Sequence, residues 1–393
     1  MIRLGSLILK EDEMGRHVHC YGESGVGKSK CIECICRTLV GRKQGFIFVD
    51  PHGKTVYDLL KYFAFWKPRQ KVYLLDTSRR DRIVGLCPFY CESKDPDELS
   101  VVVDGAVAAT MKAWGHDPLA TPRLTKWLRR LYWTIIEQDL PLTAVDHFLK
   151  YKSAEREQIL KGCSIRQEWD QLYKLPLKEF ATYMESVESR LEMFKHPQLR
   201  RILCLKENSI DLEKIWDEGS ILLVSLQESS IMGEEHNRVV GTQLMHLLTR
   251  LALRRKDNKR LYLILDECWK FVTSDFRAIL DETRKRGLSL LAFHQRLGHL
   301  DAVTASALTN AKTKLIFSTK ENPKPDRHFE CIRRGGIREN SVMQNIPDYF
   351  VKPEKLEEYI QSLLIDFYTR ETVDRLLEST DYEKELDDDD FCH

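Results

Sequence analysis

Residues 17–30 read HVHCYGESGVGKSK, and this stretch determines which fold the rest of the chain can adopt. A short segment with β-forming residues, His17 to Tyr21, runs into the loop GESGVGKS, and residues with helical periodicity follow. The spacing G-x-x-x-x-G-K-[ST] is that of a phosphate-binding loop joining a strand to a helix. The sequence therefore predicts a nucleotide-binding α/β protein.

The residue types in this loop suit phosphate oxygens. Its glycines allow backbone N–H groups to approach an anion closely, and the N-terminus of the following helix adds its dipole. Lys28 is expected to reach the β- and γ-phosphates, and Ser29 is expected to ligate Mg²⁺. The residues predicted to bind the nucleotide are Gly22, Glu23, Ser24, Gly25, Val26, Gly27, Lys28, Ser29 and Lys30.

A pair of acids follows another apolar segment, in KRLYLILDECWKF at 259–271. Residues 261–265 are apolar throughout, which fits a strand buried on both faces of a parallel sheet. Ligands of such sheets bind beyond the carboxyl ends of the strands, so Asp266 and Glu267 should lie level with the phosphate loop. We expect Asp266 to hold the metal shell and Glu267 to deprotonate the attacking water.

The stretch FIFVDPHGK at 46–54 allows two interpretations. Asp50-Pro51-His52-Gly53 satisfies D-x-x-G, the γ-phosphate-sensing turn of GTPases. A GTPase should also contain a guanine-recognition motif Asn-Lys-x-Asp, but STKEN at 318–322 lacks the required Asp. An Asp-Glu pair on a separate strand is instead typical of ATP-hydrolysing motors, so we favour ATP.

Taken in order, GESGVGKS, FVDPHGK, LILDECWKF and ILDETRKRGLSLLAFHQ resemble the HerA/FtsK superfamily of hexameric DNA-pumping ATPases. The likeness is strongest to the branch that contains HerA-type helicases and the coupling and conjugation ATPases of type IV secretion. It spans roughly residues 1–325. Members of that branch commonly have Asp-Pro-His-Gly at this place, and the resemblance implies a structural or interfacial role for it.

The resemblance also implies two further catalytic residues. Gln295 follows the apolar run LSLLAF, as the family's sensor glutamine does, and would contact the γ-phosphate or the attacking water. Arg284 matches the position of an arginine finger that reaches the neighbouring subunit's site. Lys285 and Arg286 are close enough to be the finger instead. The predicted catalytic set is Lys28, Glu267, Arg284 and Gln295, with Ser29 and Asp266 as metal ligands.

The predicted fold class is α/β, a RecA-like P-loop core with a parallel sheet that is interrupted by an all-α insertion domain. Strands alternate with helices at 1–90 and 218–325, which form the core. Residues 91–217 have apolar residues at helical spacing and form the insertion. We expect a helical or extended segment at 326–370 and a disordered acidic tail at 371–393.

The composition is that of an ordinary globular protein, with 42% hydrophobic and 31% charged residues. No apolar run reaches the roughly 18 residues of a membrane helix, so we expect a cytoplasmic protein with no membrane span. The net charge is +1, but ten acids and two bases give 371–393 a charge of −8. The remaining residues therefore carry +9, which is compatible with a polyanionic partner.

These features predict a Mg²⁺-dependent ATPase that forms a homo-oligomer, a hexameric ring, and translocates double-stranded DNA as a helicase-like motor. Two alternatives stay open. The ring could be a nucleotide-gated platform that recruits or activates a partner such as a nuclease. It could also be a secretion-type motor that moves a DNA–protein conjugate with the transfer machinery. PRLTKWLRR at 122–130 is either a DNA contact or the basic face of an amphipathic helix.

Overall fold

The computed structural model describes residues 1–89, 91, 93–114, 121–206, 208–271, 282–295, 305, 306, 308 and 311–378. The chain divides into two compact units. The first comprises Met1–Ser78, Asp211–Ser230 and Leu247–Asp366, and the second comprises Arg79–Ile210, Ile231–His246 and Phe367–His393. Within the described ranges, no helix combines the length and the apolar character needed to cross a membrane.

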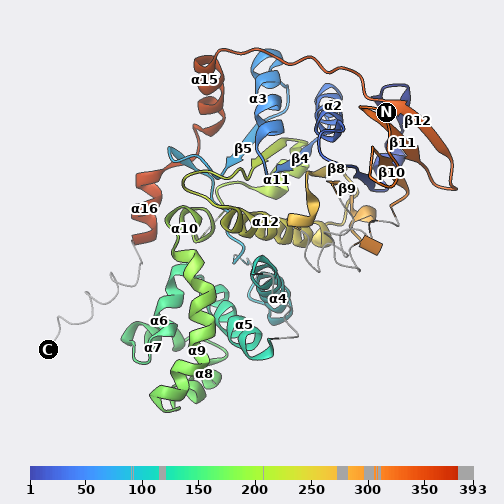
Figure 1. Ribbon diagram of the computed structural model, residues 1–393. Coiled ribbons are helices and arrows are strands. Elements are labelled where there is room, and N and C mark those ends of the chain that lie inside the picture. Colours follow the sequence, from blue (N-terminus) through green and yellow to red (C-terminus); the bar gives the residue numbers. More distant parts are fainter. Residues whose placement is uncertain are drawn as a thin grey trace. The chain divides into compact units, whose positions relative to one another are not determined.

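The first unit is built around a central sheet with nine strands in the described residues, in the order β12-β11-β10-β3-β9-β8-β4-β7-β5 (Figure 1). All pairs from β10 to β5 are parallel, whereas β11 and β12 continue the sheet as antiparallel strands. The strands are β3 (Val18–Tyr21), β4 (Phe46–Asp50), β5 (Val72–Asp76), β7 (Ile221–Ser225), β8 (Leu261–Leu265), β9 (Leu288–His294), β10 (Thr313–Ile316), β11 (His328–Ile332) and β12 (Arg338–Val342).

The inner strands of this sheet are apolar because both of their faces are covered. Every residue of β4, β7, β8 and β9 is buried. Continuous apolar runs are typical of parallel strands in α/β proteins, where helices cover both sides. The prediction of an α/β fold with a parallel sheet is confirmed; the sheet is large, and among its described strands only β11 and β12, at one edge, are antiparallel.

Helices α2 (Lys28–Gly41), α3 (Lys54–Trp66) and α15 (Pro353–Leu364) lie side by side in Figure 1. Buried residues recur along α2 at Cys31, Ile35 and Leu39, one turn apart, so one face of this helix packs inward. The unit also contains β1 (Ile2–Leu4), β2 (Leu7–Leu9), α1 (Glu11–Met14), α11 (Leu212–Glu218) and the end of α12 (Glu234–Arg254).

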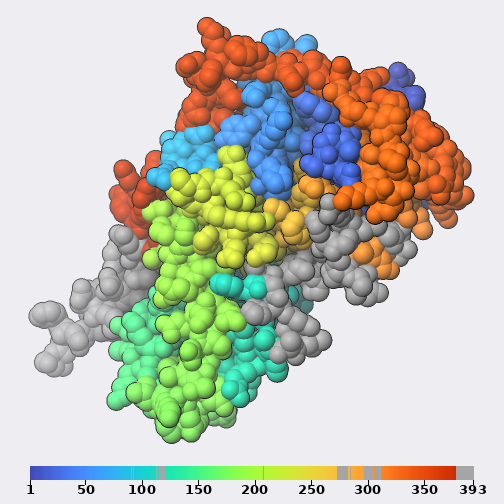
Figure 2. All heavy atoms as spheres, in the orientation of Figure 1, coloured from blue at the N-terminus to red at the C-terminus, as the bar shows by residue number. Residues whose placement is uncertain are grey.

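Residues 343–352, named the strap below, connect β12 to α15 and cross over α2 and α3 in the space-filling view (Figure 2). The Tyr349 ring of the strap packs against Tyr62 and Phe65 of α3, and three polar contacts also attach the strap to these helices. The Arg37 guanidinium donates to the Pro347 carbonyl (3.1 Å), Trp66 Nε1 donates to the Tyr349 hydroxyl (2.9 Å), and Lys30 pairs with an acid of the strap. Residues 326–366 thus contribute two sheet strands, the strap and α15.

The second unit is mainly helical. Trp169 is fully buried in this unit, where its indole Nε1 donates to Thr134 Oγ1 (2.9 Å) and its ring centroid lies 4.9 Å from that of Phe148. Its helices are α4 (Pro96–Ala113), α5 (Pro122–Glu137), α6 (Val145–Leu149), α7 (Ala154–Leu160), α8 (Arg166–Tyr173), α9 (Leu177–Leu191), α10 (Pro197–Leu203), α16 (Arg370–Glu378) and the start of α12; β6 (Arg82–Ile83) pairs with β13 (Tyr368–Thr369).

The expected acidic tail at 371–393 begins inside α16, which the sequence did not predict. Arg201 forms a bidentate contact with Asp374 of this helix, at 2.6 and 3.0 Å. Residues 379–393 lie outside the described part of the chain.

Candidate nucleotide-binding site

The loop between β3 and α2 has a backbone that requires glycine, as Gly27 and Gly22 show. Gly27, which precedes α2, has φ +106°, a left-handed conformation that strains any residue with a Cβ. A Cβ on Gly22 would lie 2.5 Å from the Cβ of Phe317, so strand β10 and the residues after it leave no room for a side chain. The loop is thereby shaped before any ligand binds.

Lys28 is the first residue of α2 and is only 6% exposed. Its ammonium group donates to the carbonyl oxygens of Gly22 (2.8 Å) and Glu23 (2.7 Å). A buried ammonium is stabilised only by such partners, so the charge is held across the loop. A phosphate group would offer Lys28 a stronger, charged acceptor at this place.

Asp50 and Asp266 lie next to each other because they stand at the carboxyl ends of neighbouring parallel strands. Val49 of β4 is paired with Leu265 of β8; Asp50 is the last residue of β4, and Asp266 directly follows β8. Burial raises the pKa of Asp266 to about 7, and the negative charges of Asp50 and Glu267 act in the same direction, whereas Lys28 opposes them. This crowding of buried carboxylates favours the binding of a cation.

The hydrogen bonds of Asp50 indicate what the Asp-Pro-His-Gly segment does within the chain. Asp50 Oδ1 accepts a hydrogen bond from the backbone N–H of His52 (2.8 Å). Its Oδ2 accepts from the N–H groups of Thr55 (2.8 Å) and Val56 (3.2 Å) in the first turn of α3. These N–H groups have no partner within the helix, so Asp50 caps α3 and fixes the turn. The contacts within the chain are therefore those of a structural residue.

Glu267 has a left-handed backbone conformation, with φ +44°, which is uncommon for a residue other than glycine. Its N–H donates to Asp266 Oδ1 (3.1 Å), and its carboxylate accepts a hydrogen bond from Trp269 Nε1 (2.9 Å). Residues held in such conformations concentrate at functional sites. Sequence reasoning missed Trp269, although an indole two residues after the acid pair was visible as a potential donor.

A buried histidine pair joins the strand of the phosphate loop to the strand that ends before Gln295. His19 Nε2 and His294 Nε2 are 2.6 Å apart, and the Gly22 N–H donates to the His294 carbonyl (3.4 Å). Burial lowers the pKa of His19 to about 3, with the nearby His294 adding to the effect, so His19 is neutral at physiological pH. The pair fixes the phosphate loop relative to Gln295, and His19 adds no charge there.

These elements surround a cleft of about 270 Å³. Gln295, directly after β9, lines the same cleft as the phosphate loop and the acid pair. The lining residues are Ser24, Gly25, Gly27, Lys28, Ser29, Lys30, Glu33, His52, Lys54, Thr55, Asp58, Asp266, Glu267 and Gln295. Of the loop residues predicted to bind nucleotide, Gly22 and Glu23 present their carbonyls to Lys28, whereas Val26 does not line the cleft.

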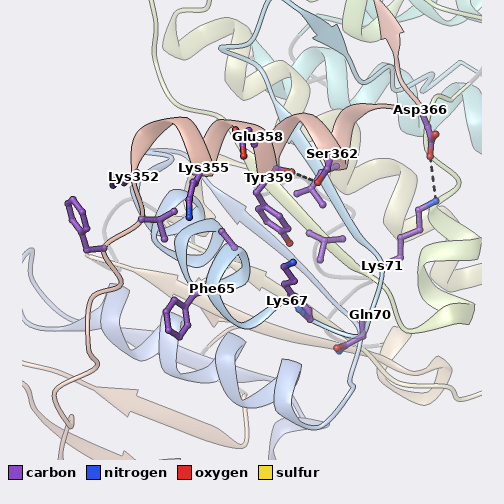
Figure 3. A pocket seen from close by; sticks show the side chains of 16 residues that line it. Phe65, Lys67, Gln70, Lys71, Lys352, Lys355, Glu358, Tyr359, Ser362 and Asp366 are labelled. Atoms are coloured by element: carbon purple, nitrogen blue, oxygen red, sulfur yellow. Dashed lines mark hydrogen bonds and ion pairs between the residues drawn. The ribbon is translucent and has the colours of Figure 1, made fainter.

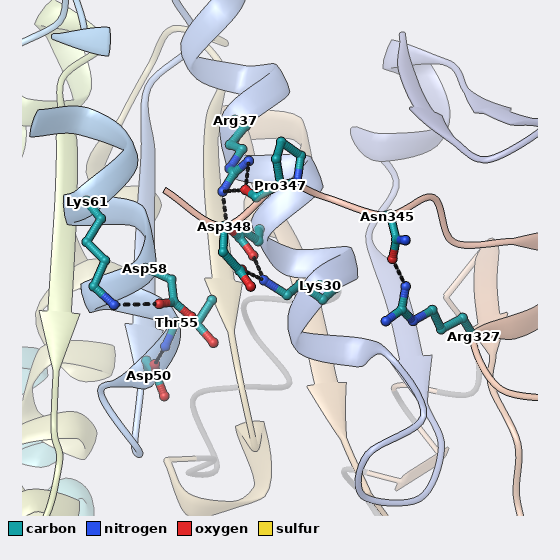
Figure 4. A network of polar contacts seen from close by, with 11 residues as sticks. Lys30, Arg37, Asp50, Thr55, Asp58, Lys61, Arg327, Asn345, Pro347 and Asp348 are labelled. Atoms are coloured by element: carbon teal, nitrogen blue, oxygen red, sulfur yellow. Dashed lines mark hydrogen bonds and ion pairs between the residues drawn. The ribbon is translucent and has the colours of Figure 1, made fainter. Parts of the chain in front are cut away.

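A polar network extends from the cleft to the strap (Figure 4). Lys30 pairs with Asp348 of the strap at 2.6 Å and with Glu33 at 2.9 Å. Arg327 contacts Asn345 of the strap. The sequence did not reveal these contacts, because Lys30 and Asp348 are separated by 318 positions.

The candidates for an arginine finger lie in the short helix η4 (Thr283–Arg286). The side chain of Arg284 lies outside the described residues, so its proposed role stays a prediction. Lys285 is exposed. Arg286 donates to the carbonyls of Leu253 and, at 3.1 Å, Arg255 of its own chain. Arg286 is therefore engaged within its own unit.

The cleft fits a nucleotide with Mg²⁺. Among the described residues, no cluster of three or more His, Cys, Asp or Glu side chains is arranged to hold a metal ion alone. Mg²⁺ is usually bound by one or two protein oxygens together with phosphates and water. The hydroxyl of Ser29 and the carboxylate of Asp266, which line the cleft together, could supply these protein oxygens.

The basic stretch 122–130 forms part of α5 in the second unit. Arg129 pairs with Asp104, and Arg130 pairs with Glu168 and stacks over the Trp127 ring, 4.4 Å from its centroid. Acids of neighbouring helices thus neutralise two of its charges. These contacts favour the amphipathic helix over the DNA contact.

Neither a protein-family model nor a curated protein sequence matches this chain. Solved structures match its fold. The plasmid coupling protein TrwB in complex with the non-hydrolysable ATP analogue ADPNP is 17% identical, with a TM-score of 0.59; 88% of this chain and 84% of TrwB are covered. TrwB in complex with ADP and Mg²⁺ has the same identity and coverage and a TM-score of 0.57.

VirB4 of Thermoanaerobacter pseudethanolicus is 13% identical, with a TM-score of 0.54, and 88% of this chain and 96% of VirB4 are covered. These likenesses show the fold of this chain, which agrees with the α/β core that the motifs predict.

Proposed function

We propose that this protein is a Mg²⁺-dependent ATPase that assembles into a ring and translocates double-stranded DNA. One observation carries the proposal: a phosphate loop, a buried acid pair and a strand-end glutamine line one cleft. Each of these groups comes from a different parallel strand of the central sheet. This is the edge of the sheet where α/β proteins bind their ligands.

Each of these residues of the cleft has its own role in ATP hydrolysis. Lys28 neutralises charge on the β- and γ-phosphates, while Ser29 and Asp266 hold Mg²⁺, which when bound offsets the charge of the phosphate oxygens. Glu267 accepts the proton of the attacking water, and the hydrogen bond from Trp269 holds its carboxylate in place. Gln295 contacts the γ-phosphate or the water.

The ring is part of the same proposal. We assign six copies to it, with Arg284 of each copy completing the cleft of its neighbour as an arginine finger. A finger supplied in trans requires assembly for rapid hydrolysis, so activity should depend on protein concentration. We also place the protein in the cytoplasm, where ATP and DNA are available.

The fold likeness supports the choice of nucleotide and cargo. TrwB is a plasmid coupling protein and has been solved with ADPNP and with ADP and Mg²⁺. Transferring these properties to the present chain is an inference, because the identity is only 17%. The acid pair lining the phosphate-loop cleft provides a basis for the inference that does not depend on the likeness.

The first test is ATP hydrolysis over a range of protein concentrations, with and without duplex DNA of a few hundred base pairs. We expect hydrolysis per copy to rise with concentration and to increase further with DNA. A high rate of ATP hydrolysis that does not change when DNA is added would exclude the DNA motor. A rate per copy that stays constant down to concentrations at which the protein is monomeric would exclude the ring.

The fold likeness to VirB4 favours a second candidate, a secretion-type motor that moves a DNA–protein conjugate. A duplex with a covalently attached protein at one 5′ end distinguishes the two. A DNA motor should be stimulated equally by the conjugate and the bare duplex, whereas a conjugate motor should respond only to the former.

A further inference from the structure

A groove of about 1040 Å³ runs between the end of α3 and α15, within the first unit (Figure 3). It is formed by two segments, 64–72 and 350–366, which are distant in the sequence. None of its lining residues lines the nucleotide cleft. The groove is therefore a separate site, and the inference below does not rest on the proposed function.

The groove has a surplus of positive charge. Four lysines line it, together with two acids, and Figure 3 shows Lys67 and Lys355 pointing into the space between the helices, beside Tyr359. One acid, Asp366, lies 4.0 Å from Lys71, where both side chains are largely exposed and the pairing is weak. The lining lysines are Lys67, Lys71, Lys352 and Lys355, and the acids are Glu358 and Asp366.

Aromatic side chains beside these lysines are unusually exposed. Phe350 is 90% exposed and Phe65 is 61% exposed, and both line the groove. Trp66, 59% exposed, contacts Phe65 edge-on with ring centroids 5.4 Å apart. Exposed aromatic groups gathered next to charges mark interaction surfaces rather than ordinary solvent-facing protein. The groove thus suits an anionic ligand that also carries apolar side chains.

The chain itself contains a segment of this chemistry. Residues 379–393 read STDYEKELDDDDFCH, with seven acids and one lysine. Phe391 directly follows four consecutive aspartates, and Tyr382 and Leu386 are interspersed among the other acids. This alternation of carboxylates with apolar side chains complements lysines interspersed with Phe65 and Phe350.

We propose that the groove between α3 and α15 binds the acidic C-terminal segment, residues 379–393, of this protein. A segment attached to the same molecule is present at an effective concentration of about millimolar, which favours it over a free acidic peptide. The groove also contains Glu358 and Asp366, whose carboxylates repel a continuous phosphate backbone. A peptide can place its own Lys384 or an uncharged residue opposite them.

The full-length protein allows a direct test by zero-length carbodiimide cross-linking, which joins a lysine amine to a carboxylate in contact. We expect amide bonds between the four groove lysines and the acids of 381–390, identified by mass spectrometry. Mixing isotope-labelled and unlabelled copies shows whether the segment comes from the same or another copy, and either result supports the proposal. Cross-links from these acids only to lysines outside the groove would overturn it.

A second measurement follows the accessibility of the segment. A glutamate-specific protease should cut at Glu383 and Glu385 slowly in the native protein. The K352E/K355E variant should be cut about tenfold faster, the factor that corresponds to 1.4 kcal/mol of lost binding. The matched variant K152E/K178E, with exposed lysines of the second unit, should behave as the native protein does.

Charge reversal on both sides distinguishes a direct contact from a general effect of charge. Replacing Asp387–Asp390 by lysines should release the segment, and combining this change with K352E/K355E should restore protection. Unchanged cleavage in K352E/K355E, or failure of the combination to restore protection, would contradict the proposal. If K352E/K355E instead weakened only oligonucleotide binding, the groove would be a nucleic-acid site and the proposal would be wrong.

Discussion

The nucleotide cleft and the groove between α3 and α15 belong to the same unit but are built in opposite ways. In the cleft, Lys28, Asp266 and Glu267 are each no more than 6% exposed. In the groove, Phe65 and Phe350 are more than half exposed, and all four lysines face solvent. The cleft is organised before a ligand binds, whereas the aromatic side chains and lysines of the groove stay exposed until a partner covers them.

This difference determines how each site should respond to substitution. Buried charges interact strongly because water does not screen them, so changes in the cleft should have large effects. Exposed pairs are screened and contribute about 1 kcal/mol or less each, so only combined changes in the groove should be measurable. Substitutions in the groove should also leave ATP hydrolysis in the cleft largely unchanged.

The largest effect is expected for Glu267→Gln. Removing the base should lower the ATP hydrolysis rate by about 10²–10⁴-fold while ATP binding persists, because the amide keeps the shape of the side chain. Hydrolysis is followed by phosphate release and binding by equilibrium dialysis. Glu179→Gln, on an exposed part of α9, is the matched control. Full activity of the Glu267→Gln variant would show that the cleft does not work as proposed.

A smaller loss is expected for Trp269→Phe, which removes the hydrogen bond to the Glu267 carboxylate. A hydrogen bond of about 1 kcal/mol corresponds to a rate decrease of roughly fivefold. As a positioning residue, Trp269 should affect kcat and leave the Kd for ATP unchanged. Trp133→Phe removes a comparable indole hydrogen bond, to Ser164, in the second unit and serves as control. An equal loss in both variants would indicate a general stability effect.

The ionisation of Asp266 should make the stability of the folded protein depend on pH. Its pKa in the folded protein, about 7, lies above its ordinary value of 3.8. The folded state therefore binds this proton more tightly than the unfolded state, and stability falls as the pH rises between these values. Asp266→Asn cannot ionise, so in the absence of nucleotide its Tm should exceed that of the native protein by about 2 °C or more at pH 8.

At pH 5 the folded protein still holds this proton, whereas the unfolded chain has largely lost it. The difference in Tm should therefore be smaller than at pH 8, and it should vanish only below about pH 3.8. Asp58→Asn, at the rim of the same cleft, is the control. The measurement is thermal unfolding of both variants at the two pH values. If the difference in Tm between Asp266→Asn and the native protein were the same at pH 5 and pH 8, the pKa of Asp266 would not be raised in the folded protein.

The smallest effect on catalysis is expected for K352E/K355E. ATP hydrolysis should stay within about twofold of the native rate, because exposed charges are screened over a Debye length of about 8 Å in physiological salt. Phosphate release measured beside K152E/K178E gives the comparison. A large loss of hydrolysis in the groove variant alone would show that the two sites are coupled.

The sequence predicted the centre of the fold well because the interactions there are local or repeat a strong pattern. The phosphate loop depends on glycines and a lysine within eight positions, and the buried strands appear as apolar runs. Asp266, Glu267 and Gln295 were placed correctly at strand ends in one cleft, since parallel strands bring their carboxyl ends to the same edge. Their catalytic roles stay predictions.

Other features depend on contacts between distant residues. Residues 328–342 have no long apolar run, yet they form β11 and β12, because β10 offers a free edge for pairing. The capping of α3 by Asp50 also became visible only with its backbone partners in place.

By itself, the sequence determined an α/β core with the motif of a phosphate loop, because this motif is short and its geometry follows from neighbouring residues. Tertiary structure alone decided that Asp348 pairs with Lys30 and that Phe350 and Lys355 line one groove with Phe65 and Lys67. The physical reason is chain distance: about 300 residues separate these partners, and only the pairing of strands and packing of α15 on α3 bring them together.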